Sequence, residues 1–151
     1  MAYNTLLERG VSFVETSEKY GIALRPSSLS AEHILARCME EQKTDNAVLI
    51  ATTFANPLLS LRFGASSVVK AAEASCSRLD ASGVEILQVQ RTLFYPGLVN
   101  GLAKAVDNGY CNSVGACNLG KNRLKAFARK LERRGLTLTS NQVRNHTKLV
   151  Q

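Results

Sequence analysis

The segment over residues 115–122 contains the residue types of a phosphate-binding loop. It reads Gly115-Ala-Cys-Asn-Leu-Gly120-Lys121-Asn122 and lies between an expected strand and an expected helix. In such a loop, backbone N–H groups and a lysine hold the phosphates of a nucleotide. Asn122, however, stands where a serine or threonine hydroxyl would bind Mg²⁺. A P-loop-like nucleotide binder therefore remains an alternative that lacks its metal ligand.

The cysteines and histidines are too dispersed for the common metal sites and nucleophile arrangements. No C-x-x-C pair occurs, which argues against a zinc site. The chain also has neither a G-x-S-x-G nucleophile motif nor a G-x-G-x-x-G dinucleotide motif. We expect no bound metal, and four reduced thiols in an intracellular protein. The residues concerned are Cys38, Cys76, Cys111, Cys117, His33 and His146.

Composition and charge favour one soluble globular domain over residues 1–151. The chain is 45% hydrophobic and 21% charged, with no apolar run near the roughly 18 to 20 residues that span a membrane. Its net charge of +7 comes from the C-terminal part, because residues 120–151 hold nine Lys or Arg and one acid, Glu132. We expect the basic C-terminal helix to contact an acidic protein or lipid headgroups, unless it is simply a solvated face. Nucleic acid is not expected, since no aromatic residues interleave with the charges.

Apolar residues switch repeatedly between a helical and a strand period, which predicts β/α units. We expect Ile34, Leu35, Cys38 and Met39 to face the core from one helix. Five strands separated by helices favour a parallel α/β architecture, either open and doubly wound or part of a closed barrel. The expected strands cover residues 11–14, 47–52, 84–89, 113–117 and 138–143, and the helices 2–9, 30–42, 66–79, 97–108 and 121–134.

Five ordered motifs resemble those of the aldo-keto reductase family. They are FVETSEKYG at 13–21, VLIATTF at 48–54, RLDASGVEILQVQ at 78–90, VGACN at 114–118 and SNQV at 140–143. The resemblance covers essentially the whole chain, with the spacing of the plant and algal chloroplast-type branch. It implies a (β/α)₈ barrel, a fold of about 200 to 250 residues. We therefore expect a partial barrel that runs from the first helix through the sixth strand.

The resemblance also implies a catalytic tetrad, of which this sequence keeps one member. In the family a tyrosine donates a proton to the substrate carbonyl, and an aspartate, a lysine and a histidine tune and orient it. Tyr20 matches the tyrosine. Glu15 stands where the aspartate belongs, Thr53 where the lysine belongs and Gln90 where the histidine belongs. If Glu15 is buried, it needs solvent or another donor, because its lysine is missing.

The resemblance assigns cofactor contacts to three further residues. Asn118 and Gln142 match the residues that hold the nicotinamide carboxamide, and Cys117 replaces the usual serine. In the family, residues of the seventh and eighth strands and their loops bind the rest of NADPH. The five motifs end before those strands. We therefore expect no cofactor on this chain alone, and NADPH only if the barrel is completed.

Two functions follow from the resemblance. The first is a catalytically degenerate binding or structural subunit, because a partial barrel leaves two strand edges that a partner chain or a second copy should cover. The second is an NADPH-dependent carbonyl reductase that is active once another chain or segment completes the barrel. By resemblance, a plastid is the expected location, although no transit peptide is visible.

Overall fold

The computed structural model describes residues 2–21, 30–43, 48–54, 64–90 and 97–144, and within them helices and strands alternate. In that part of the chain, no helix has the length and apolar character needed to cross a membrane. The helices are α1 (Ala2–Glu8), α2 (Ala31–Gln42), α3 (Ala65–Leu79), α4 (Leu98–Asp107) and α5 (Lys121–Glu132); the strands are β1 (Phe13–Ser17), β2 (Leu49–Phe54), β3 (Val84–Gln90), β4 (Cys111–Cys117) and β5 (Leu138–Gln142).

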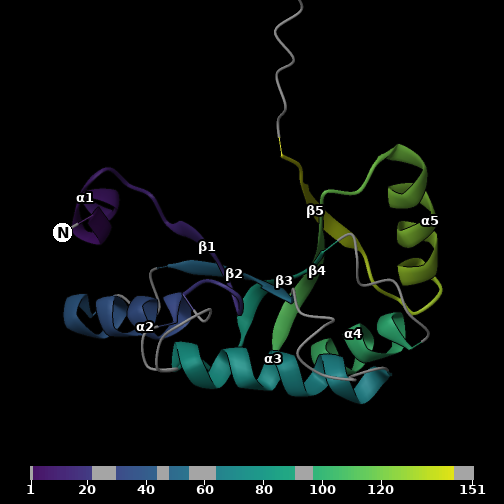
Figure 1. Cartoon of the computed structure of the whole chain (residues 1–151), viewed down its shortest axis with the longest axis horizontal. Helices are drawn as coiled ribbons and strands as arrows, with labels where there is room; N and C mark the ends of the chain where they lie inside the picture. Colours follow the sequence, from purple (N-terminus) through teal and green to yellow (C-terminus); the bar gives the residue numbers. More distant parts are fainter. Residues whose placement is uncertain (1, 22–29, 44–47, 55–63, 91–96, 145–151) are drawn as a thin grey trace, which may run out of the picture.

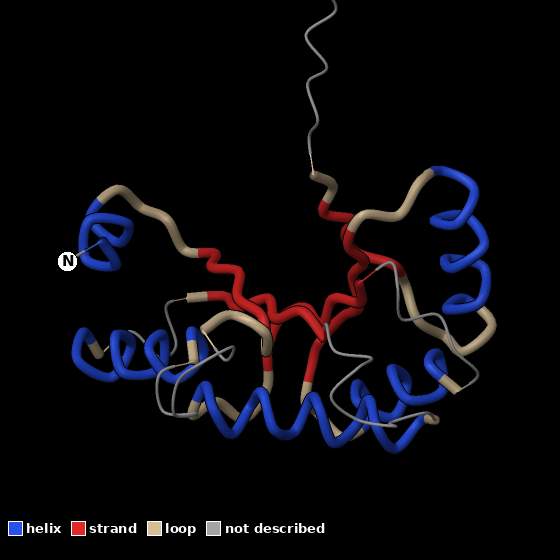
Figure 2. Tube along the Cα trace, viewed as in Figure 1, coloured by secondary structure: helices blue, strands red, loops and turns tan. Residues whose placement is uncertain are grey.

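The five strands form one parallel sheet in the order β1-β2-β3-β4-β5. Figures 1 and 2 show this sheet as a curved trough, with α2, α3, α4 and α5 around its convex side and the concave side open. A doubly wound sheet would carry helices on both faces. Sequential strand order with helices on one side is the arrangement of a barrel, so the expected partial (β/α)₈ barrel is confirmed.

Two strands begin later than their apolar residues predict. The first was expected over 11–14 and the second over 47–52, but β1 begins at Phe13 and β2 at Leu49. Phe13 and Leu49 are register partners and lie on the open concave side, where they are 44% and 52% exposed. Phe13 and Leu49 thus occupy positions that face the interior of a barrel, and the described part of the chain leaves this side uncovered.

The core lies between the sheet and the helices on its convex side. Its fully buried side chains include Val68, Leu87, Leu102, Phe127 and Leu131. The hydroxyl of Ser30 accepts a hydrogen bond from the His33 backbone N–H at 3.4 Å and caps α2, as its sequence predicts.

One expected core position of α2 is wrong. Ile34 is 47% exposed, whereas Glu32 of the same helix is fully buried, at 0%. The buried side of α2 is therefore rotated from the side that apolar periodicity indicates, and it carries a carboxylate.

The Glu32 carboxylate is held by two partners from neighbouring elements. Arg78 Nε of α3 lies 2.6 Å from Oε2, and Thr52 Oγ1 of β2 donates to Oε1 at 2.7 Å. Arg78 Nη2 also donates to Ser75 Oγ at 3.0 Å. These bonds tie α2, α3 and β2 together through one buried charge pair, in which each oxygen of the carboxylate has a donor.

Arg78→Ala should destabilise the protein by about 3 to 5 kcal/mol, because it leaves the Glu32 charge buried without a counterion. Urea unfolding measures the effect. The double variant Glu32→Gln with Arg78→Met should recover most of the loss, since glutamine still accepts from Thr52 and no buried charge remains. A loss below about 1 kcal/mol in Arg78→Ala would show that water replaces the guanidinium.

Candidate functional site

The candidate site lies on the concave side of the sheet, at the carboxyl ends of the strands. Parallel pairing places these ends at one edge, which in barrel enzymes carries the reacting groups. The structure brings together four of the predicted site residues, each from a different strand: Glu15, Thr53, Cys117 and Gln142.

Gln142 connects the two edge strands across the trough. Its Nε2 donates to Glu15 Oε2 at 2.7 Å, and its Oε1 accepts from Cys117 Sγ at 3.6 Å. Glu15, for which the resemblance provides no lysine, thus has a hydrogen-bond donor in Gln142. The Cys117 thiol has one hydrogen, which it can donate either to Gln142 or, at the shorter distance of 2.9 Å, to Gln88 Oε1. The bond to Glu15 is therefore the shorter and firmer contact of the Gln142 amide.

Gln88 forms the second half of the network and was not predicted as a site residue. Its Oε1 accepts from Thr53 Oγ1 at 3.1 Å and from Cys117 Sγ at 2.9 Å, and all three side chains are buried. The sequence contains a signal for it, because Gln88 and Gln90 are polar at alternate positions around the apolar residues Leu87 and Val89. A strand that keeps a buried amide needs partners for it on the same face.

Gly115 allows β4 and β5 to approach closely beside this network. A Cβ atom at this position would overlap Ser140 Oγ and come within 3.0 Å of Gln88 Cγ. The pairing of β4 with β5 is irregular between Val114 and Gly115. The glycine therefore brings Gln142 into reach of Cys117 and Glu15.

Three predicted site residues lie outside the network. Tyr20 follows β1 in a turn and is 56% exposed, and Gln90 is half-buried at the end of β3. Asn118 follows β4 with a left-handed φ of 59° and is exposed, and its Oδ1 accepts from the Arg144 N–H at 2.9 Å. The expected tetrad positions thus flank the same edge, but hydrogen bonds of the described residues do not join them into one group.

The network contains hydrogen-bonding groups but no cation and no activated nucleophile. Burial raises the pKa of the Glu15 carboxyl, and the bond from Gln142 offsets part of that shift. Burial also raises the pKa of the Cys117 thiol; the bond with Thr53 lowers it and the Glu15 charge raises it further. Cys117 is therefore a neutral hydrogen-bond donor at pH 7, not a thiolate. No group of three His, Cys, Asp or Glu side chains suited to a metal occurs among the described residues.

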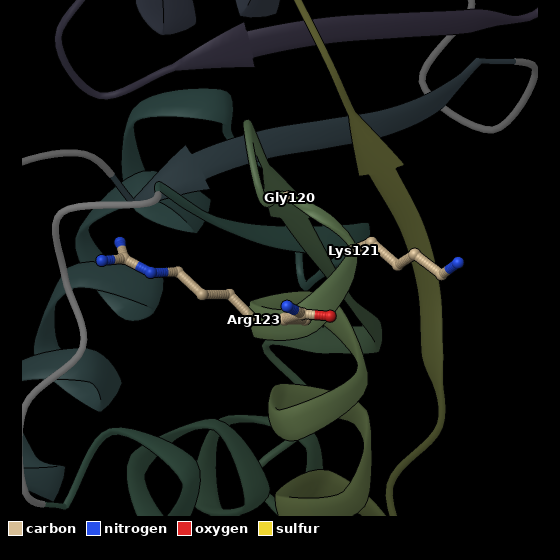
Figure 3. Close-up of a pocket in the computed structure, with 4 residues that line it drawn as sticks. Gly120, Lys121 and Arg123 are labelled. Carbon is tan, nitrogen blue, oxygen red and sulfur yellow. The ribbon is translucent and has the colours of Figure 1, made fainter.

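The loop that resembles a phosphate-binding motif forms an open pocket of about 530 Å³ at the start of α5. It is lined by Gly120, Lys121, Asn122 and Arg123. Figure 3 shows the side chains of Lys121 and Arg123 extending in opposite directions from the helix. They do not converge on one point, as the groups that hold a triphosphate must.

Glu15→Gln should stabilise the protein relative to wild type by an amount that grows with pH. Because its pKa is raised in the folded state, Glu15 contributes stability below its ordinary value of 4.5 and loses it as pH rises through the folded value. Urea unfolding near pH 4.5 and at pH 7 measures the difference.

Gln142→Ala provides the companion test. It removes the bond that lowers the pKa of Glu15, so its stability should fall more steeply with pH than that of wild type. If Glu15→Gln differs from wild type equally at both pH values, the Glu15 carboxyl is not desolvated.

Solved structures of other proteins share the fold described above. Aldo-keto reductase AKR11C1 from Bacillus halodurans, in its holo form, is similar with a TM-score of 0.70 at 13% identity, over 95% of this chain and 45% of that one. The thermostable aldo-keto reductase Tm1743, in complex with the inhibitor epalrestat, gives a TM-score of 0.76 at 14% identity, over 95% and 48%. This chain thus spans about half the length of these structures, and the low identities show a shared fold alone.

Comparison of the sequence with other proteins identifies the family of this chain. No curated protein is similar enough to this chain to count as a match. The sequence profile of the aldo/keto reductase family, in contrast, matches residues 1–147, which is nearly the entire chain. From this match, and from a sheet with the strand order of a barrel, we conclude that the chain belongs to the aldo/keto reductase family.

Proposed function

We propose that this chain is a catalytically degenerate family member that acts as a binding or structural subunit of a larger assembly. The observation that carries the proposal is Thr53, at the position the resemblance assigns to lysine. Its side chain is buried, and its hydroxyl donates to Gln88. A catalytic tyrosine at neutral pH needs a nearby positive charge, and no cation belongs to the network beside Glu15.

The residues of the network do not fit a nicotinamide. The amide of Gln142, which the resemblance assigns to the carboxamide, donates to Glu15 at 2.7 Å, and its oxygen lies 3.6 Å from the Cys117 thiol. Binding a carboxamide there would break the bond to Glu15 and leave the half-buried Glu15 without its donor. Asn118 is exposed and accepts from the Arg144 backbone. Tight cofactor binding by these residues is therefore not expected.

The open concave side supports a role in assembly. Phe13 and Leu49 form an exposed apolar pair there, and β1 and β5 are the edge strands of the sheet. Unpaired strand edges and apolar patches are normally covered in folded proteins. The occupant is a segment or partner that supplies strands to both edges and apolar side chains to Phe13 and Leu49. The plastid as location, and the chloroplast-type branch, belong to the same proposal and rest on motif spacing.

Tyr20 favours a second candidate function. Its ring is exposed at the carboxyl edge, where the tyrosine of a reductase would meet its substrate. Because the chain spans about half of its structural relatives, an NADPH-dependent carbonyl reductase is the function to test if the rest of the barrel is supplied.

The double variant Phe13→Asn with Leu49→Asn should weaken assembly and reduce the binding of an apolar dye, because it makes the open side polar. Native mass spectrometry and dye fluorescence measure both effects. Ile34→Asn is the matched control, since Ile34 is similarly exposed but lies on α2, away from the concave side. A monodisperse wild-type monomer without dye binding would refute the role in assembly.

A titration with NADPH should show no binding to the native assembly purified from its source. The measurement is native mass spectrometry under mild conditions. Binding of NADPH would favour the reductase instead, and Thr53→Lys with Gln90→His should then raise carbonyl turnover by restoring the missing cation and the missing imidazole. If an assembly without NADPH binding also gains no turnover from this double variant, the degenerate role stands.

A further inference from the structure

Helix α5 and the two residues that follow it present a strongly basic surface, which we call the basic face. All of its cations are exposed, and none forms an ion pair with an acidic side chain in the part of the chain that the structure describes. Glu132 is the one acidic residue among them. The basic face consists of Lys121, Arg123, Lys125, Arg129, Lys130, Arg133 and Arg134.

The fold fixes which side of α5 is basic. Phe127 and Leu131 are fully buried on the side that packs toward the sheet. Lys125, Arg129 and Arg133 recur at every fourth position, so they lie along one line of the helix on its outer side. Figure 1 shows α5 at the outer end of the trough beside β5. The cations are thus held on a rigid, outward-facing helix.

A flat anionic surface can meet several of these cations at once. Arg123 and Lys130 flank the central line of Lys125, Arg129 and Arg133, and long Lys and Arg side chains reach sideways while their stems stay near the helix. Because the apolar side of α5 is buried, the helix has nothing to insert into hydrocarbon. Contact with such a surface is therefore electrostatic.

The composition of the basic face favours lipid headgroups over other polyanions. The centre of a protein interface is enriched in aromatic and apolar anchors and depleted of lysine. The exposed residues between these cations are Asn122, Ala126 and Glu132, and no large apolar residue of α5 is exposed. Single-stranded nucleic acid requires exposed aromatic stacking partners, and the one aromatic residue of α5, Phe127, is buried. A bilayer with anionic lipids requires only clustered cations.

We propose that the basic face of α5 docks this protein reversibly onto the anionic surface of a lipid bilayer, without insertion. This inference stands apart from the proposed function, since it concerns the convex side of the sheet and requires neither NADPH nor a completed barrel.

The test compares binding to vesicles of phosphatidylcholine with about 30% phosphatidylserine and to vesicles of phosphatidylcholine alone. The full chain should float with the anionic vesicles only. Raising the salt from about 0.1 M to about 1 M should release it, because the Debye length falls from about 10 Å to about 3 Å. The variant with Lys125, Arg129 and Arg133 each changed to glutamine should lose at least about tenfold in binding.

A matched control separates the basic face from net charge. The variant with Arg37, Lys70 and Lys104 changed to glutamine removes the same charge from exposed positions of α2, α3 and α4. It should bind anionic vesicles nearly as wild type does, and circular dichroism should show both variants folded. Equal losses in the two variants would overturn the proposal, as would binding to phosphatidylcholine alone. Tighter binding to duplex DNA or to polyglutamate, with the same dependence on the α5 cations, would reassign the face to those partners.

Discussion

Parallel register is the constraint on which the site depends. Thr53 pairs with Gln88, Gln90 with Cys117, and Cys117 with Gln142, so side chains far apart in sequence face one another across adjacent strands. A shift of one residue in any strand would turn its polar side chains into the helical layer. The buried pair of Glu32 and Arg78 has the same importance on the convex side, because it joins α2 and α3 to β2, the strand that carries Thr53.

The network on the concave side and the Glu32–Arg78 pair on the convex side stabilise their buried polar groups in different ways. On the convex side a full charge is retained and neutralised by a guanidinium. On the concave side an amide, a hydroxyl and a thiol satisfy one another, and Glu15 is the one carboxylate. Neutral groups in reciprocal hydrogen bonds need no counterion and cost less to bury. The described residues of the concave side therefore form a polar network in which no side chain is a cation.

The sequence predicts the order and type of the elements because helical and strand periods alternate clearly. It fails at Ile34 and Glu32, because a buried ion pair contradicts the rule that apolar residues define the packed side. It ends β1 and β2 too early, because both strands continue through polar residues such as Glu15, Ser17 and Thr53, which a search for apolar runs leaves out. Glu15, Thr53, Cys117 and Gln142 were found by motif. Gln88 alternates with Gln90 in the sequence, but its contacts with Thr53 and Cys117 are what place it in the network.

The sequential strand order has a consequence for how the chain acquires its structure. Each β/α unit packs on the unit made just before it, so nearly all contacts between elements can form while later parts of the chain are still being synthesised. Among the described residues, the bond between Gln142 and Glu15 spans the most sequence, since it joins residues 127 positions apart. It forms only after β5 has docked on β4. The carboxylate of β1 thus stays solvated until the amide of β5 is in place, so its partial burial depends on all five described strands.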